Sequence, residues 1–202
     1  MKLTPSQLPM PKGSSYFWDA PQLPKDGDLY PYVKNEDGDE VPLQFICQIN
    51  CAELPPCALP SKGMLYFFGT VDYFLGYDVV YDNGLGWWRD GSVVAIYSDA
   101  DLDTLERQNP YTEDDMILPH PITFTSTPNE SDDGFRLLGK PFEDDVRQEV
   151  PRGWVQLLQL DSEETEHFSL MFHDMGLLYV FIEKERLAKG DFSRLRAYMT
   201  SM

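Results

Sequence analysis

The sequence predicts an α+β protein: a single sheet-dominated, antiparallel-rich domain with an internal duplication and a few short helices. The first observation is a repeat, in which an apolar run at residues 43–50, a polar loop and a run at residues 63–68 recur as 154–161, a longer polar loop and 176–181. Each run is short and rich in aromatic and branched side chains, as β-strands are. The second observation is that strands mix with short helices without regular βα alternation, which favours antiparallel pairing.

The chain is expected to consist of an N-terminal arm, residues 1–41, packed on a duplicated domain, residues 42–202. The arm contains six prolines: Pro5, Pro9, Pro11, Pro21, Pro24 and Pro31. Because proline lacks a backbone donor, we expect the arm to supply no central strand of a sheet. Its aromatic residues, among them Tyr16, Phe17 and Trp18, predict that it is anchored on the domain rather than disordered.

Between the two copies, the sequence predicts two further strands and a helix. The strands, Tyr77 to Tyr81 and Ser92 to Tyr97, are separated by a glycine-rich turn. The helix is expected from Asp99 to Gln108, because Ser98 and Asp101 have the spacing of a capping box and acidic residues fill the first turn.

In the second half, a strand is expected at Pro121 to Thr125, and helices at Phe142 to Glu149 and Glu183 to Lys189. Glu143 and Arg147 lie four residues apart in the first helix and are expected to pair. A glycine follows the second helix, in the position where helices commonly end.

The net charge of the chain restricts its partners. The 34 acidic and 16 basic residues give a formal net charge of −18. Such a chain lacks the cations that phosphate binding requires, so neither nucleic acid nor an anionic membrane is an expected partner. A basic protein is the natural complement, although high charge also serves to keep an aromatic-rich protein soluble.

The apolar segments and the cysteines both favour an intracellular protein with reduced thiols. No run of about 18 apolar residues exists and the N-terminus lacks a secretory apolar stretch, so we expect a cytoplasmic protein. Cys47, Cys51 and Cys57 are odd in number and crowded into one region, which fits reduced thiols better than disulfides. No cofactor is expected.

Catalytic motifs are missing from the sequence, so we do not expect an enzyme. No serine elbow and no glycine-rich phosphate loop is present. His167 and His173 lie near several carboxylates, but six residues apart they share neither a helix face nor a strand face. We therefore expect no metal site, and a metal-assisted hydrolase built on these histidines is a remote alternative.

Gln48 and Gln159 occupy corresponding positions in the two copies. A buried amide must find hydrogen-bond partners, so we expect the two to bond across the pseudo-two-fold axis or to the opposing loops. A ligand site formed by the paired glutamines is the alternative.

The candidate binding residues are aromatic and acidic. Trp87 and Trp88 lie in a turn, where rings supply contact area at low entropic cost. The alternative is that one ring lies in the core and the other is half exposed. The acidic candidates are Asp132, Asp133, Glu143, Asp144, Asp145, Glu163 and Glu164.

The repeated strands also carry a family likeness. The segments 42–50, 59–68, 157–162 and 174–182, with the closing residues 191–194, together resemble the YwqG-like family of bacterial proteins of unknown function. The resemblance implies a compact mixed domain dominated by sheet, and it transfers no catalytic residue. Domains similar to this one accompany bacterial toxins, where the implied role is immunity. The chain departs from the family in the run Met171-Phe172-His173-Asp174-Met175-Gly176, where relatives often have Trp-Gly-Asp.

Charge and resemblance together predict a non-enzymatic acidic binding protein. The leading hypothesis is an immunity protein that neutralises a basic, nuclease-type toxin by presenting carboxylates in place of phosphates. The alternative is a housekeeping domain of unknown role that binds a small ligand or a protein through the interface between the repeats.

Overall fold

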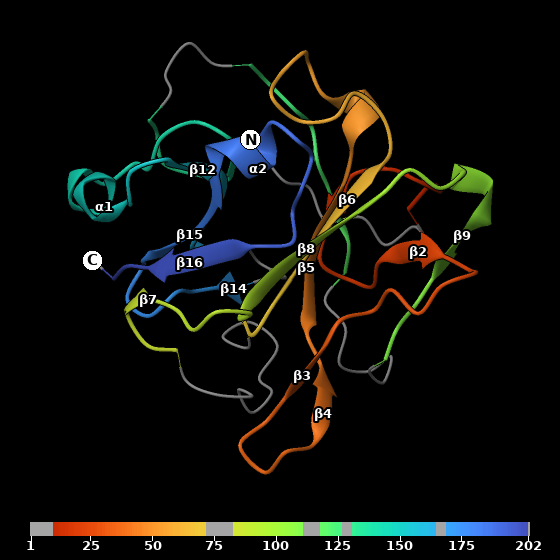
Figure 1. The fold of residues 1–202 in the computed structure, drawn as a ribbon, viewed down its shortest axis with the longest axis horizontal. Coiled ribbons are helices and arrows are strands. Elements are labelled where there is room, and N and C mark those ends of the chain that lie inside the picture. The colour runs from red at the N-terminus through yellow and green to blue at the C-terminus, as the bar shows by residue number, and fades with distance from the viewer. Residues whose placement is uncertain (1–9, 72–82, 111–117, 127–130, 165–168, 202) are drawn as a thin grey trace.

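Two five-stranded antiparallel sheets form the framework of the protein in a computed structural model that describes residues 10–71, 83–110, 118–126, 131–164 and 169–201 (Figure 1). The first sheet has the strand order β10-β1-β5-β6-β8. Its strands are β10 (His120–Pro121), β1 (Tyr16–Phe17), β5 (Gln44–Asn50), β6 (Met64–Gly69) and β8 (Val93–Ser98). The second sheet has the order β11-β12-β15-β16-β7. Its strands are β11 (Arg136–Leu137), β12 (Trp154–Asp161), β15 (Leu177–Glu183), β16 (Leu195–Met199) and β7 (Gly86–Trp87).

Smaller elements surround the two sheets. Three two-stranded sheets pair β2 (Gln22–Pro24) with β9 (Leu105–Arg107), β3 (Tyr32–Lys34) with β4 (Glu40–Pro42), and β13 (Glu163–Glu164) with β14 (Ser169–Leu170). The helices are short: the 3-10 turns η1 (Cys51–Glu53) and η2 (Leu102–Thr104), and the α-helices α1 (Asp144–Glu149) and α2 (Lys184–Leu187). The described protein is therefore mostly antiparallel sheet, and its two α-helices are short. No helix in these described ranges is long and apolar enough to cross a membrane.

The two halves repeat one strand arrangement in detail. The pairs β5–β6 and β12–β15 each contain one bulge, at Ile46 and at Leu157. In each half, a short strand, β1 or β11, pairs with the bulged strand, and the residue that follows this short strand has a positive φ, 61° at Trp18 and 60° at Leu138. Its backbone N–H donates to the carbonyl of the bulged residue at 2.9 Å in both halves. The repeat therefore extends from the sequence to the backbone.

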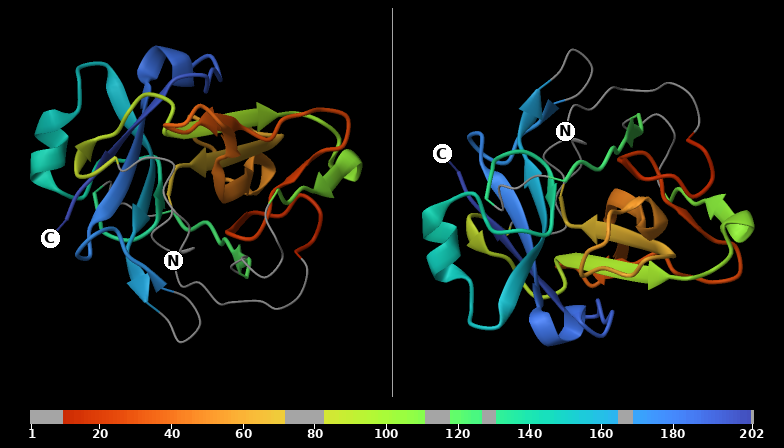
Figure 2. Two further views of the ribbon diagram at one scale, coloured as in Figure 1. Left: turned by 90° about the horizontal axis from the view of Figure 1, so that it is seen from below. Right: turned by 90° about the horizontal axis from the view of Figure 1, so that it is seen from above.

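One apolar core joins the two sheets, which lie side by side in both views of Figure 2. Alternate residues of each strand point into it, as the two-residue period of a strand requires. Ile49 and Phe67 come from the first sheet, and Leu160 and Val180 from the second. The two halves of the chain also exchange strands between the sheets. The early strand β7 pairs with β16 in the second sheet, and the later strand β10 pairs with β1 in the first sheet.

The outer faces of the two sheets are covered differently. On the first sheet, Tyr66 and Phe68 pack beneath Leu23, Tyr30 and Leu105 of the arm and β9. On the second sheet, Tyr179 and Phe181 pack beneath α1, whose Val146 is buried against them. The second outer face therefore has a short helix where the first has an extended arm.

The arm is more deeply integrated than the prolines predict. The expectation that it supplies no central strand is wrong for Tyr16–Phe17, because β1 lies between β10 and β5 in the first sheet. This dipeptide contains no proline and pairs on both sides. Of the prolines near it, Pro21 directly precedes β2 and Pro24 is the last residue of β2, which pairs with β9.

Two of the three predicted helices are present in shorter form, and the third is not. The helix expected from Asp99 to Gln108 is wrong: Asp101 caps the 3-10 turn η2, and the chain then extends as β9. Pairing with β2 overrides the local helical signals there. Gly190 has a φ of 65° beyond α2, as a helix end requires. The strand expected at Ser92 to Tyr97 corresponds to β8, whereas the one at Tyr77 to Tyr81 lies outside the described residues.

Candidate functional site

The outer side of the second sheet gathers most of the acidic residues that the sequence singles out. We define the acidic face as the carboxylates on the loop before β11, at the end of β12 and on α1: Asp132, Asp133, Asp161, Glu143, Asp144, Asp145 and Glu149. Electrostatic coupling links its parts, since Asp133 and Glu143 both act on the Asp161 carboxyl. The fold therefore brings together acidic segments that are separate in the sequence.

A guanidinium holds the segment that enters α1. Arg147 Nη1 donates to the Pro141 carbonyl at 2.5 Å, the Phe142 carbonyl at 2.7 Å and Ser131 Oγ at 2.6 Å. Arg147 also pairs with Asp144. The expected side-chain pair between Glu143 and Arg147 does not form in the described part of the chain, where Glu143 instead accepts from the Tyr179 hydroxyl at 2.9 Å.

Buried and shared charges shift the pKa values on this face. Burial raises the pKa of Asp161, and the nearby Asp133 and Glu143 carboxylates add to the increase, while backbone donors from Gly134 and Ser162 oppose it. The Gly134 N–H lies 2.7 Å from Asp161 Oδ2. Burial, followed by the Glu143 carboxylate, raises the pKa of Tyr179. Both shifts favour the protonated forms of Asp161 and Tyr179.

The repeat places Gln48 and Gln159 in equivalent positions with different hydrogen bonding. Each is fully buried, and each donates through Nε2 to an equivalent loop carbonyl, Ser14 at 2.8 Å for Gln48 and Gly134 at 2.9 Å for Gln159. Gln48 Oε1 accepts from the Gln22 N–H at 2.8 Å. Gln159 Oε1 has no donor in the described part of the chain. The glutamines bond to the loops of their own halves, not to each other across the pseudo-two-fold axis.

The equivalent tyrosines differ in the same way. The Tyr66 hydroxyl donates to the Gln22 carbonyl at 2.7 Å, whereas the Tyr179 hydroxyl donates to the Glu143 carboxylate. In the first half, the backbone of β2 therefore satisfies both the glutamine and the tyrosine. In the second half, a carboxylate replaces the carbonyl, and within the described ranges nothing replaces the N–H.

In the described structure, buried glutamine side-chain oxygens without a donor are concentrated on β12. Among the described residues, the buried glutamine oxygens without a donor are those of Gln44, Gln156 and Gln159. Gln156 and Gln159 both belong to β12 and flank its bulge, and they face outward with Phe181 and Tyr179. A buried acceptor without a donor is costly, so two of them on the same face of β12 identify the place where a donor is missing.

The two tryptophans fall in different environments. The Trp88 side chain is 4% exposed in the core, and its Nε1 donates to the Gly84 carbonyl at 3.0 Å, so its ring offers no partner contact. Trp87 is partly buried on β7, where its ring packs against Phe181 and Tyr198. The Arg196 guanidinium lies 4.2 Å from its centroid. The structure therefore has the alternative arrangement that the sequence left open, in which one tryptophan ring lies in the core and the other is partly exposed.

A second ring beside Trp87 is not predicted from the sequence. Trp154 lies on the same outer face, with the Arg194 guanidinium 5.7 Å and the Arg196 guanidinium 5.9 Å from its centroid. The signal was available in the alternation of β16, which places Arg196 outward, while Arg194 directly precedes this strand. Arginine over tryptophan is a favourable arrangement that fixes the rings on the surface.

The remaining candidates do not form a reactive centre in the described chain. Glu163 and Glu164 form β13, and the structure describes their backbone only. His173 is exposed in a turn with a φ of 51°, and His167 lies outside the described residues. Within the described ranges, no three metal-binding side chains come together. The thiols are free, and burial raises the pKa of Cys51 to about 11.

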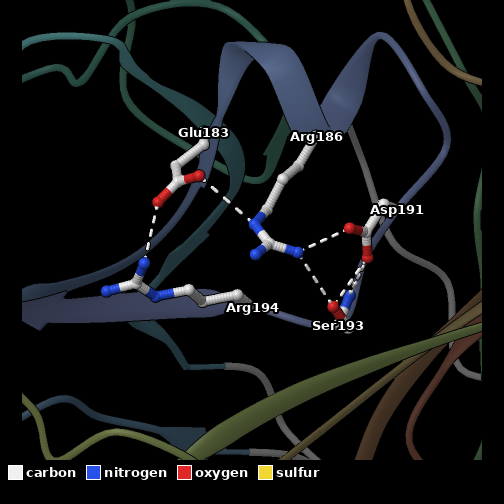
Figure 3. Close-up of polar contacts among 5 residues, drawn as sticks. All are labelled: Glu183, Arg186, Asp191, Ser193 and Arg194. Atoms are coloured by element: carbon white, nitrogen blue, oxygen red, sulfur yellow. Dashed lines mark hydrogen bonds and ion pairs between the residues drawn. The ribbon is translucent and has the colours of Figure 1, made fainter.

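The closing residues 191–194 form a structural network (Figure 3). Arg186 Nη1 donates to Asp191 Oδ2 at 2.5 Å and to Ser193 Oγ at 3.1 Å. Glu183 accepts from Arg186 Nε at 3.2 Å and from Arg194 Nη1 at 3.0 Å. These bonds fix the turn between α2 and β16, so this motif connects elements of the second sheet.

Fold and site together define a two-sheet, antiparallel protein whose halves repeat one strand arrangement and whose second sheet carries an acidic face. The model of a family described as a domain of unknown function, DUF1963, matches residues 19–133 and again residues 95–200. The chain belongs to this family. The two overlapping matches agree with the structural repeat. No curated protein matches the chain.

Proposed function

We propose that this protein is a non-enzymatic acidic binding protein that captures a basic protein. The observation that carries the proposal is the acidic face, which collects carboxylates from three separate segments on a chain of net charge −18. Such a field raises the local concentration of a cationic partner and accelerates its capture. The exposed Phe142 beside Glu143 supplies apolar area at the same place.

The partner we propose is a bacterial toxin of the nuclease type, which makes the protein an immunity protein of the cytoplasm. A nuclease cleft is cationic because it holds phosphates, and carboxylates at similar spacing are its natural competitors. The resemblance to YwqG-like proteins supports this choice. The alternative, a small-ligand site between the repeats, has less support, since apolar side chains from both sheets pack in that interface.

The experiment is a growth rescue. Genes adjacent to this one in its native genome are expressed singly, and any toxic product is co-expressed with the wild-type protein and with a variant carrying Asp132→Asn, Asp133→Asn, Glu143→Gln, Asp144→Asn and Asp145→Asn. We expect the wild type to restore growth and the variant to fail. Amides keep the hydrogen-bond acceptors, so folding is retained.

A matched control removes the same charge from the arm, by Asp26→Asn, Asp28→Asn, Glu36→Gln, Asp37→Asn and Asp39→Asn, all at exposed positions. This control is expected to rescue growth like the wild type. If both variants rescue equally, the acidic face plays no part in capture.

A further inference from the structure

The second half of the domain lacks one hydrogen-bond donor that the first half has. The chain runs from Trp18 to Gln22 in the first half and from Leu138 to Phe142 in the second, with Pro21 and Pro141 in register. Gln22 is 9% exposed, and its N–H reaches Gln48 Oε1. Phe142 is 43% exposed, and no N–H of the described residues 138–142 reaches Gln159 Oε1. The Arg147 guanidinium binds this segment through the Pro141 and Phe142 carbonyls.

The candidate site on the outer side of β12 consists of hydrogen-bond acceptors. Gln156 and Gln159 are 2% and 0% exposed, and their Oε1 atoms have no donor in the described chain. Glu143 and Asp161 add carboxylates to the same neighbourhood. Of the cations already present on this face, Arg147 pairs with Asp144, whereas Arg136 lies opposite Gln159 in the register of β11 and β12, with its guanidinium 3.8 Å from Asp132.

We propose that this site binds an arginine side chain of the partner protein, with Gln159 Oε1 and Gln156 Oε1 accepting from the guanidinium and with Glu143 and Asp161 as counter-charges. A guanidinium carries five donors in a planar fork, and it forms charge-assisted bonds with several acceptors at once. Lysine offers a single point of charge and matches the paired oxygens less well. The inference rests on the proposed function and names the side chain that the acidic face recognises.

Entry to the site involves the connection between β11 and α1. Because Gln159 is fully buried, the guanidinium reaches Oε1 when the segment 139–143 moves outward. The exposed Phe142 ring of this segment then packs on the apolar stem of the arginine. In the first half, the corresponding place is closed by β2, so binding is expected in one half only.

The test uses an acetylated, amidated tetra-arginine peptide and the side-chain amide signals of the full-length protein in ¹H–¹⁵N NMR. We expect the Gln159 signals to shift and saturate while the Gln48 signals, from the equivalent satisfied glutamine, remain in place. Gln159→Met is expected to weaken binding about tenfold, the loss of a charge-assisted bond. Tetra-lysine is expected to shift the Gln159 signals less.

Peptide binding that moves backbone signals on the acidic face but leaves Gln159 unmoved would overturn this inference and leave the proposed capture intact. Absence of binding by either peptide would also overturn it, and the growth rescue then decides the proposed function separately. The wild-type spectrum provides the answer even if the Gln159→Met variant fails to fold.

Discussion

Gln48 and Gln159 occupy the same position in the two halves, two residues after equivalent bulges, yet only Gln48 has partners at both ends of its amide. The Gln22 N–H and the Ser14 carbonyl enclose the Gln48 amide at 2.8 Å each. Gln159 donates to two carbonyls, and within the described chain its oxygen accepts nothing. The same backbone therefore supports a closed polar site in one half and an incomplete one in the other.

The first prediction compares the two glutamines in the isolated protein. Gln48→Met leaves the buried Gln22 N–H without an acceptor, and we expect it to lower the free energy of unfolding by about 2–3 kcal/mol. Gln159→Met removes two donated bonds but also an unsatisfied oxygen, and its loss is expected to be smaller by about 1 kcal/mol. Urea denaturation of both variants measures the difference. Equal losses would show that Gln159 Oε1 already has a partner, such as a bound water.

The sequence predicts the strand framework well and the acidic site in part. The repeat predicts β5, β6, β12 and β15, because their apolar and turn-forming residues act locally. The failure at residues 99–108 arises from tertiary pairing of β9 with β2, which no local pattern contains. The roles of Tyr179 and Glu143 depend on where α1 packs. The incomplete Gln159 amide becomes visible only when the two halves are superimposed in three dimensions.

The second prediction concerns Asp161. Its pKa is raised in the folded protein, so folding favours the protonated form; that contribution is present below the ordinary value of 3.8 and is lost as pH rises through the raised value. Asp161→Asn keeps an oxygen for the Gly134 N–H and removes the charge. We expect the variant to be at least as stable as the wild type at pH 7 and the difference to vanish below pH 3.8. Thermal melts across pH measure it, and a wild type that is clearly more stable at pH 7 would contradict the prediction.

The third prediction concerns the crossing of the halves. Cleavage between residues 107 and 111 separates β7 and β8 from the second sheet and β10 from β1. Each fragment then exposes part of the shared core, so we expect both to be insoluble or unfolded when expressed alone. Circular dichroism and solubility provide the measurement. Two soluble fragments with independent melting transitions would show two separate domains instead.

The most direct test of the acidic-face account is stopped-flow association with the toxic partner identified by growth rescue. We predict an on-rate that falls by about tenfold or more between low and high salt, with a smaller change in the off-rate, because long-range attraction acts on encounter. The variant neutralised at Asp132, Asp133, Glu143, Asp144 and Asp145 is predicted to lose most of this salt dependence, and the arm variant to keep it. An on-rate insensitive to salt, with normal binding by the neutralised variant, would contradict capture by the acidic face.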